Sequence, residues 1–346
     1  MTPRKARYSR YGMQIAAAAL ISTCCLQPVS AGQTTDVAVD AEAAARDNWR
    51  AVMAHNTDLW EGCFQASYPS TVWEEVDCRE LHPRVPPVFH KPGEGQVTGN
   101  GHDYVAQAPG LISGTLGTFP KVTGVKSEKS VGVAAFGDGG ILGPNEYSLQ
   151  VNTNLTGTTS ACDGHAGCFV WQQFIYATDY ETEGKAAVFM QYWLIGWGDS
   201  DCPRGFDSDG EGDCFGNSKS VAAPDVKATS LGKLSLSGAA EAGSKDTVVF
   251  TDGTTAYSVS GSDSVLDISK VWHQSEFNVV GDAGGSRADF NTPVSITMKV
   301  ALTDGSTSAP TCVANAGTTG ETNNLNLGSC SRKSGAKPFI EFTQSN

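Results

Sequence analysis

The most restrictive feature of the sequence is the stretch CFVWQQFIYATDYETEGKAAVFMQYWLIGW, residues 168–197. It reads as two strands that are apolar and aromatic almost throughout. Their interiors nevertheless carry three uncharged amides, Gln172, Gln173 and Gln191, where Val or Ile would serve. Such an amide is most often a solvated residue or a hydrogen-bonded core residue, because a buried polar group needs partners. The stretch therefore predicts a buried β structure and raises the question of what the amides do.

The rest of the chain is also β in character. From about residue 97 onward, short runs rich in Thr, Val, Ser and Tyr alternate with Gly, Asn and Asp turns. This pattern predicts an all-β fold, a jelly-roll or concanavalin-like antiparallel β-sandwich. A single convincing helix precedes it in DVAVDAEAAARDNWRAVMAHNTDLW. Its apolar residues at helical spacing are Val39, Ala43, Trp49, Val52 and Met53.

Residues 1–31 have the order of a secretory signal peptide. A basic start, MTPRKARYSRYGMQ, is followed by the apolar run IAAAALIST and by the small-residue end PVSAG. The apolar run is too short to span a membrane. We therefore expect cleavage after Ala31 and a secreted, extracellular protein, or a periplasmic one if it is retained, with no membrane association of the mature form.

The mature chain divides into two parts. Residues 32–96 form a helical and disulfide-bearing segment that ends in the Pro-rich link HPRVPPVFHKPGEG, and residues 97–346 form the β-sandwich domain. We find no internal repeat of fixed period and no nucleotide-binding glycine loop.

Charge excludes several classes of partner. The formal net charge of −13 becomes −17 without the signal peptide, which holds four basic and no acidic residues. An acidic surface argues against nucleic acid and anionic lipid as partners. We expect a monomer, and a mildly acidic environment suits so many carboxyl groups.

Eight of the ten cysteines follow the signal peptide. An even number in an exported protein predicts four disulfides, although the sequence alone permits many pairings. No pair has the spacing of a zinc site. Neighbours in sequence would pair as follows: Cys63 with Cys78, Cys162 with Cys168, Cys202 with Cys214, and Cys312 with Cys330.

Three segments collect polar residues, aromatic residues or both on one strand face. In NEYSLQVNTN, alternation predicts a half-buried strand whose polar face holds Glu146, Ser148, Gln150, Asn152 and Asn154. In WHQSEFNVV, one face holds Trp272, Gln274, Glu276 and Asn278. In FMQYWLIGW, one face holds Phe189, Gln191, Trp193 and Trp197. A concave sheet lined by such faces would form a cleft for an extended polymer.

The order of these segments resembles the glutamic peptidases of the eqolisin type. In that family a glutamine on one strand pairs with a glutamate on a late strand, followed by a Gly-rich turn and an A-D-F segment. Here SEFNVVGDAGGSRADF lies at the late position, while VWQQFIYA, FMQYWLIGW and LSLSGAAEAGSKDTVVF resemble the earlier strands. The resemblance covers about residues 110–303, and the neprosin-type glutamate peptidases are more distant cousins.

The resemblance implies an acid-active endopeptidase with a polypeptide substrate and no cofactor. Glu276 would be the general base that activates water and then the acid, and Gln172 would donate to the oxyanion. Adjacent Gln172 and Gln173 point to opposite faces, so the sequence leaves open which of them faces Glu276. Where the family has a further carboxylate, this chain has Gln191. The substrate-binding residues would be Gln173, Gln191, Trp193, Trp197 and Trp272.

A non-catalytic protein is the competing interpretation. A secreted β-sandwich could bind a polysaccharide or protein through the same face, or serve as a structural surface protein without a cleft. The two classes differ at Glu276, since a peptidase needs its carboxylate and a binding module would tolerate Gln.

Two further segments carry weaker predictions. The loop FDSDGEGDCFG sets Asp207, Asp209, Glu211 and Asp213 at alternate positions, a spacing compatible with Ca²⁺, although a solvated acidic loop is the simpler interpretation. The segment 32–96 lies where secreted peptidases often carry a propeptide. The alternative is an integral subdomain held by Cys63 and Cys78.

Overall fold

The computed structural model describes residues 31–82, 102–155, 157–198, 201–314 and 320–346. The predicted signal peptide, apart from Ala31, and most of the Pro-rich link lie outside these ranges. The chain forms two compact units, Met1–Ala43 and Ala44–Asn346. The helix α1 (Ala31–Met53) begins in the first unit and ends in the second.

The predicted helix is confirmed, with a narrower buried stripe than its sequence suggests. Trp49 and Met53 are buried and pack against Ala66 and neighbouring apolar residues of the second unit. The Trp49 indole also donates a hydrogen bond of 2.7 Å to the carbonyl of Ser70. Val52 is 42% exposed, so it does not belong to the core. No helix within the described ranges is long and apolar enough to cross a membrane.

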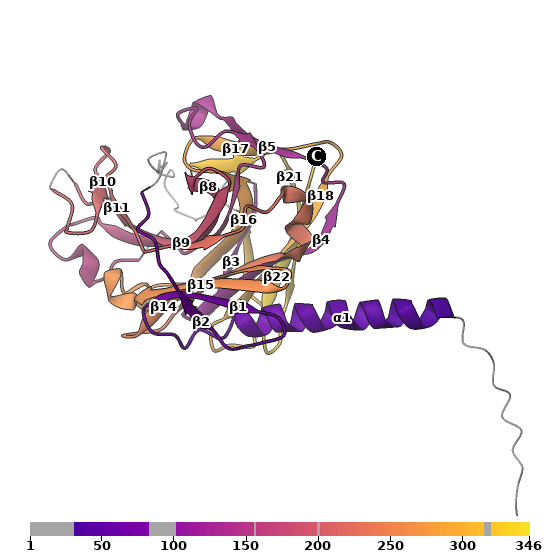
Figure 1. Ribbon diagram of the computed structural model, residues 1–346. Helices are drawn as coiled ribbons and strands as arrows, with labels where there is room; N and C mark the ends of the chain where they lie inside the picture. Colours follow the sequence, from indigo (N-terminus) through magenta and orange to yellow (C-terminus); the bar gives the residue numbers. More distant parts are fainter. Residues whose placement is uncertain (1–30, 83–101, 156, 199–200, 315–319) are drawn as a thin grey trace, which may run out of the picture. The chain divides into compact units, whose positions relative to one another are not determined.

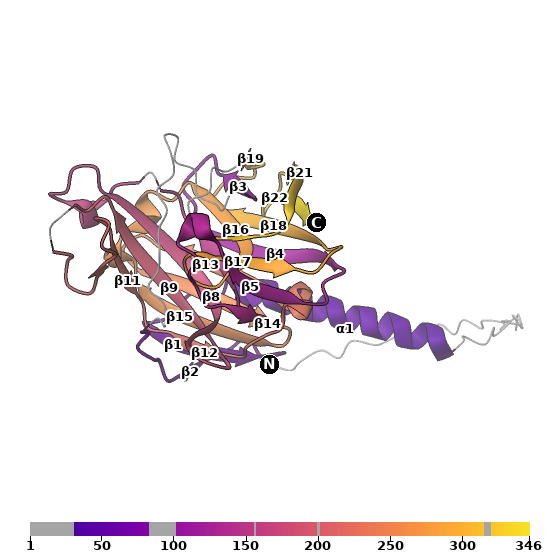
Figure 2. The ribbon, with the colours of Figure 1, turned by 90° about the horizontal axis from the view of Figure 1, so that it is seen from above.

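The second unit contains two nine-stranded sheets and a small four-stranded sheet. Every strand pair among the described residues is antiparallel except β17 with β20. The predicted all-β sandwich is therefore confirmed (Figure 1, Figure 2). The first sheet, in spatial order, contains β2 (Glu74–Val76), β1 (Gly62–Ser67), β15 (Thr255–Ser262), β14 (Lys245–Asp252), β13 (Leu234–Ala240), β4 (Gly114–Thr123), β18 (Ser295–Thr303), β22 (Phe339–Ser345) and β21 (Asn326–Lys333).

The second sheet carries the long hairpin predicted from residues 168–197. In spatial order it contains β10 (Asp207–Ser208), β11 (Cys214–Asn217), β9 (Lys185–Ile195), β8 (Phe169–Thr182), β7 (Tyr147–Asn152), β16 (Gln274–Gly281), β3 (Tyr104–Gln107) and β19 (Thr311–Ala314), with β12 (Val221–Ala223) also paired to β9. The small sheet contains β20 (Glu321–Asn323), β17 (Ser286–Phe290), β5 (Glu128–Gly132) and β6 (Gly143–Pro144). Short 3₁₀ helices lie at Ala134–Phe136, Ser160–Cys162, Ala228–Lys233, Asp263–Val265 and Ile268–Lys270.

Glycines of the first sheet receive aromatic rings of the second. A Cβ atom added to Gly117 on β4 would lie 2.1 Å from the Phe277 ring, and one added to Gly238 on β13 would lie 2.3 Å from the Phe174 ring. These close approaches show that one face of the second sheet packs on the first sheet. Because side chains alternate along a strand, Glu276 and Gln173 lie on the opposite face.

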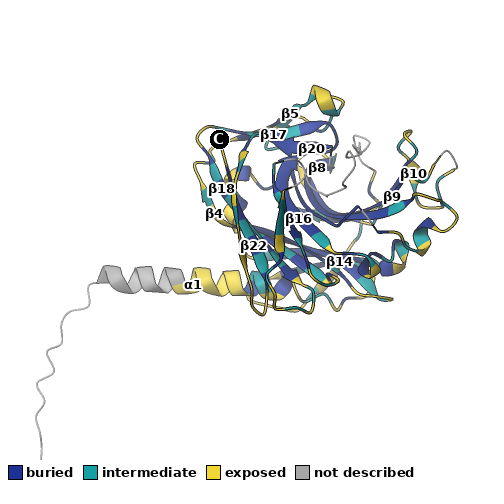
Figure 3. Ribbon diagram, turned by 180° about the vertical axis from the view of Figure 1, so that it is seen from behind, coloured by how far each residue is buried: buried dark blue, intermediate teal, exposed yellow. Residues whose placement is uncertain are grey.

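Both faces of the central strands are buried, as Figure 3 shows for β8 and β9. All six residues of β7 are buried as well. The prediction that NEYSLQVNTN forms a half-buried strand is therefore wrong, because its polar face is buried as well as its apolar face. Its polar side chains are enclosed and depend on hydrogen bonds within the protein.

The four predicted disulfides are all formed, with Cα–Cα distances of 5.3 Å for Cys63–Cys78 and 6.3 Å for Cys312–Cys330. The other two pairs are Cys162–Cys168 and Cys202–Cys214. The N-terminal segment contributes β1, which pairs with β15 from Gly62 to Ser67. Removal of the segment 32–96 during maturation stays a prediction.

Candidate active site

The register of the second sheet places five polar side chains in one line. Glu276 on β16 is opposite Asn152 on β7, and Asn152 is opposite Gln173 on β8. Gln173 is in turn opposite Gln191 on β9, which is opposite Asn217 on β11. Directly opposed residues of neighbouring strands share a face. We call these five residues the amide row, and it ends at the carboxyl group of Glu276.

The indole of Trp193 fixes the orientation of two amides in this row. An indole N–H can only donate, and here it donates to Gln173 Oε1 at 3.1 Å and to Gln191 Oε1 at 3.0 Å. The amide nitrogen of Gln191 therefore points away from Trp193, toward Asn217 Oδ1 at 2.9 Å. The amide nitrogen of Gln173 points the other way, toward Asn152 Oδ1 at 3.1 Å.

Asn152 connects Gln173 to Glu276. Its amide nitrogen donates to Glu276 Oε2 at 2.7 Å and lies 3.2 Å from Gln150 Oε1. Gln150 Oε1 also accepts from Gln173 at 3.1 Å. The buried amides thus form a chain of neutral, oriented donors that ends on a carboxyl oxygen, which Val or Ile in their place could not do.

Glu276 is a deeply buried acid with other acids around it. It is 1% exposed, and the carboxyl group of Asp103, just before β3, is near enough to influence its pKa. Burial raises the pKa of Glu276 above its ordinary value, and the influence of Asp103 together with the hydrogen bond from Asn152 counteracts part of that rise. Glu321 on β20 has a pKa of about 8, because it is buried and close to the charge of Glu276.

Gln172 does not meet Glu276. It is opposite Tyr192 rather than Gln191, and its side chain lies on the face that packs on the first sheet. There its amide nitrogen is 3.8 Å from Met190 Sδ, and the side chain is close enough to Asp246 of β14 to counteract part of the rise that burial causes in the pKa of that carboxyl group. The sequence left open which of the two glutamines faces Glu276. The register answers that it is Gln173, so Gln172, to which the donor role was assigned, is not in that position.

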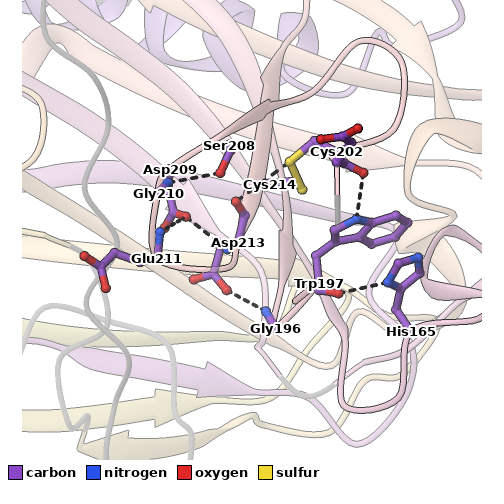
Figure 4. Close-up of a disulfide and its surroundings, with 11 residues drawn as sticks. His165, Gly196, Trp197, Cys202, Ser208, Asp209, Gly210, Glu211, Asp213 and Cys214 are labelled. Atoms are coloured by element: carbon purple, nitrogen blue, oxygen red, sulfur yellow. Dashed lines mark hydrogen bonds between the residues drawn. A yellow bond between two sulfur atoms is a disulfide. The ribbon is translucent and has the colours of Figure 1, made fainter. Parts of the chain in front are cut away.

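The three tryptophans predicted to bind substrate lie in three different surroundings. Trp193 belongs to the network of the amide row, whereas Trp272 precedes β16 and is fully buried. The Trp272 ring stacks on Phe174 with centroids 5.6 Å apart, so it belongs to the core between the sheets and does not share the face of Glu276. Trp197 lies beyond the end of β9 and stacks on His165 with centroids 3.3 Å apart (Figure 4).

The acidic loop uses its oxygens within the protein (Figure 4). Asp209 Oδ1 accepts from the backbone N–H of Glu211 at 2.8 Å and of Asp213 at 3.0 Å. Buried Asp213 accepts from the backbone N–H of Gly196 at 2.6 Å. Asp207 and Glu211 are exposed. Within the part of the chain that is described, no group of three or more His, Cys, Asp or Glu could hold a metal ion.

Among the described residues, the predicted open cleft along Glu276 is not observed. Glu276 and Gln173 are 1% and 4% exposed, and a buried apolar cluster that includes Ile175, Phe189 and Leu81 contains residues on the same face of β8 and β9. A cavity of about 750 Å³ opens at the other end of the row, beside Asn217. Its charged lining residues are Glu61, Glu75, Asp77, Arg204 and Lys219.

Sequence reasoning missed Asp103 and Glu321. Asp103 precedes a short strand directly after the Pro-rich link, and Glu321 lies on a three-residue strand in a Gly- and Thr-rich region. Neither has a periodic pattern around it that would mark a face. The only available signal was the carboxyl group itself.

No family model matches the chain, and no curated protein matches it. Among solved structures, it is similar to the crystal structure of scytalido-glutamic peptidase with a transition state analog inhibitor. The identity is 9%, the match covers 70% of this chain and 96% of that chain, and the TM-score is 0.26. This similarity is too low to support the fold or the function, and neither depends on it.

Proposed function

We propose that the protein is a secreted glutamic-type endopeptidase that hydrolyses peptide bonds at acid pH. Glu276 is the general base, and Gln173 is the amide that stabilises the oxyanion. The observation that carries the proposal is the amide row, in which Trp193 directs the amide nitrogen of Gln173 toward the side where Glu276 lies. The motifs shared with the eqolisin-type peptidases support the same assignment of Glu276.

The reaction needs one base and one neutral donor. Glu276 takes a proton from a water molecule while the water oxygen attacks the carbonyl carbon of the peptide bond. The developing oxyanion accepts a hydrogen bond from Gln173. The C–N bond then breaks, and the proton held by Glu276 passes to the leaving nitrogen. An amide donor adds no second charge beside Glu276, which a carboxylate at the same position would do.

The donors of Gln173 are occupied in the free protein by the neutral oxygens of Asn152 and Gln150, each at 3.1 Å. A charged oxyanion accepts a stronger hydrogen bond than a neutral amide oxygen. The substrate therefore competes favourably for one N–H of Gln173 as the transition state forms. The other N–H keeps the side chain in place.

The raised pKa of Glu276 determines the acidic limit of the pH range in which the protein is active. The base works only when it is ionised. Activity should therefore rise with pH, at pH values above those at which an ordinary glutamate ionises. We therefore expect a mildly acidic optimum rather than a strongly acidic one.

The test is cleavage of a denatured protein substrate from strongly acidic to neutral pH, with the secreted protein used as purified and after incubation at acid pH. Glu276→Gln should abolish cleavage, and Gln173→Ala should lower turnover by about 10²-fold or more, the size of a lost oxyanion donor. Gln172→Leu is the matched control on the opposite face. Its rate per folded molecule, with folding checked by near-UV circular dichroism, should stay close to that of the wild type.

Two results would reject the proposal. One is the absence of cleavage by the wild type at every pH, and the other is full activity of Glu276→Gln. If Glu276→Gln instead retains binding of a polysaccharide or protein ligand and the wild type cleaves nothing, the protein is a binding module.

A further inference from the structure

A short stretch of the N-terminal segment is attached to the sheet that carries the amide row. Arg79 exchanges two backbone hydrogen bonds of 2.9 Å with Ser220, which directly precedes β12. Two residues further on, Leu81 is 8% exposed, whereas Glu80 and His82 on either side of it are exposed. Leu81 lies outside the strands and is nevertheless buried. It is therefore a single apolar anchor between exposed polar residues, as in a peptide bound to the edge of a sheet.

The cluster that contains Leu81 belongs to the face of the amide row. It includes Ile175 of β8 and Phe189 of β9, which are directly opposite each other in the register. This pair lies two residues along its strands from the opposed pair Gln173 and Gln191. Side chains two residues apart on a strand share a face and are about 7 Å apart along it. The cluster therefore begins about 7 Å from the amide row, on the same face of the sheet.

Two opposed pairs of different size form this part of the face. Next to the large pair Ile175 and Phe189 is the small pair Ala177 and Ala187, and all four residues belong to the cluster of Leu81. We call these four residues the apolar patch. None of their side chains has a polar group, and each of them is buried. A large pair beside a small pair leaves a step in the surface, which suits a branched aliphatic side chain.

We infer that the apolar patch is a substrate subsite for a branched aliphatic side chain, and that Leu81 occupies it in the free protein. Two residues of an extended chain also span about 7 Å. The substrate is therefore a polypeptide with leucine or a similar residue about two positions from the bond that is cleaved. The inference rests on the proposed function and deepens it by naming the class of substrate.

Leu81 is held in a way that lets a substrate displace it. Besides Leu81 itself, the stretch is attached by the backbone hydrogen bonds at Arg79 and by an ion pair of 3.7 Å between Glu80 and Lys219. Both partners of this ion pair are exposed, so it contributes little. The disulfide at Cys78 ties the stretch to β1. Displaced Leu81 therefore stays nearby and competes with the substrate at a high effective concentration.

The first experiment measures kcat and KM of the full secreted protein with peptides that carry leucine or alanine two positions before or after the cleaved bond. At one of the two positions, leucine should raise kcat/KM by about 10-fold or more over alanine, because an aliphatic group enters an apolar subsite. Leu81→Ala should lower KM for that leucine peptide by about 10-fold or more and leave kcat unchanged, because the internal competitor is weakened. Leu59→Ala is the matched control. Leu59 is also 8% exposed but lies outside the cluster, so KM should not change.

Hydrogen exchange tests the subsite without relying on catalysis. The Glu276→Gln variant, which should not cleave, is mixed with the leucine peptide or with the alanine peptide. The leucine peptide should displace Leu81 and so speed exchange of the backbone N–H groups of Arg79 and Ser220, which are hydrogen-bonded in the free protein. The alanine peptide should have a smaller effect at the same concentration.

The outcomes separate the subsite from the proposed function. If the protein cleaves both peptides equally well, or if Leu81→Ala and Leu59→Ala have the same KM, the subsite is wrong and the proposed function stands. If Leu81→Ala does not fold, exchange decides, and exchange at Arg79 and Ser220 that the leucine peptide leaves unchanged overturns the inference. Faster exchange in a protein whose wild type cleaves nothing rejects the peptidase, and the apolar patch is then a binding site for an aliphatic side chain.

Discussion

Replacing Glu128 by glutamine should remove part of the protein's sensitivity to rising pH. Glu128 begins β5 opposite Phe290, is 2% exposed, and neither of its carboxyl oxygens has a hydrogen-bond partner among the described residues. Burial raises its pKa to about 9, with smaller contributions from the charges of Glu146 and Asp289. The folded protein therefore holds a proton on Glu128 at a pH where the unfolded chain has lost it.

The sign and size of the effect on stability follow from the pKa of Glu128 in the unfolded chain and in the folded protein. The group's ordinary pKa is 4.5, so its contribution to stability is complete below that pH and is lost progressively as the pH rises toward about 9. Each pH unit in this window costs about 1.4 kcal/mol, so the free energy of unfolding should fall by about 2–3 kcal/mol between about pH 5 and about pH 7 because of Glu128 alone. Gln cannot ionise, so Glu128→Gln should avoid this part of the loss.

Urea unfolding followed by tryptophan fluorescence measures the effect. The quantity to compare is the loss of unfolding free energy between the two pH values, in the wild type, in Glu128→Gln and in Glu74→Gln, an exposed control on β2. Other buried carboxyl groups contribute to all three losses, and the comparison cancels them. Equal losses in the wild type and Glu128→Gln would refute the reasoning.

Three further predictions concern packing, the acidic loop and maturation. Gly117→Ala should lower the free energy of unfolding by about 1–3 kcal/mol, because its new methyl group overlaps the Phe277 ring, and an unchanged urea midpoint would contradict the packing. Asp213→Ala should cost about 1–3 kcal/mol by leaving the Gly196 N–H unpaired, while EDTA should leave the wild-type Tm unchanged; a Tm lowered by EDTA would restore the calcium interpretation. N-terminal sequencing of secreted protein should find a terminus directly after Ala31, and a second terminus near residue 96 after acid incubation would identify a propeptide.

The fold could be predicted from sequence because its signals are local. Turn residues mark the strand ends, and cysteines close in sequence pair with one another, as Cys162 and Cys168 do. The third sheet was not predicted. Its strands are short, and β17 and β20 pair across more than thirty residues of sequence, between Ser286 and Glu321, which no local pattern records.

The site could be predicted only in part, for a reason specific to β8. Gln172 and Gln173 are both surrounded by buried apolar residues, since this strand is covered on both faces. Alternation separates the two amides but does not say which face belongs to Glu276. That choice depends on the register with β7, where Asn152 lies opposite Gln173. Asp103 likewise joins the site through tertiary structure alone.

Gly117 and Gly238 of the first sheet, which receive aromatic rings of the second sheet, also restrict how the two sheets can move relative to each other. Phe277 and Phe174 fit where β4 and β13 lack a side chain, and sliding one sheet by a single residue would drive each ring against a Cβ atom. Shear between the layers, a common way for packed elements to change conformation, is therefore blocked. If the proposed function is correct, a polypeptide would reach the face that carries Glu276 through movement of loops and side chains rather than through sliding of the sheets.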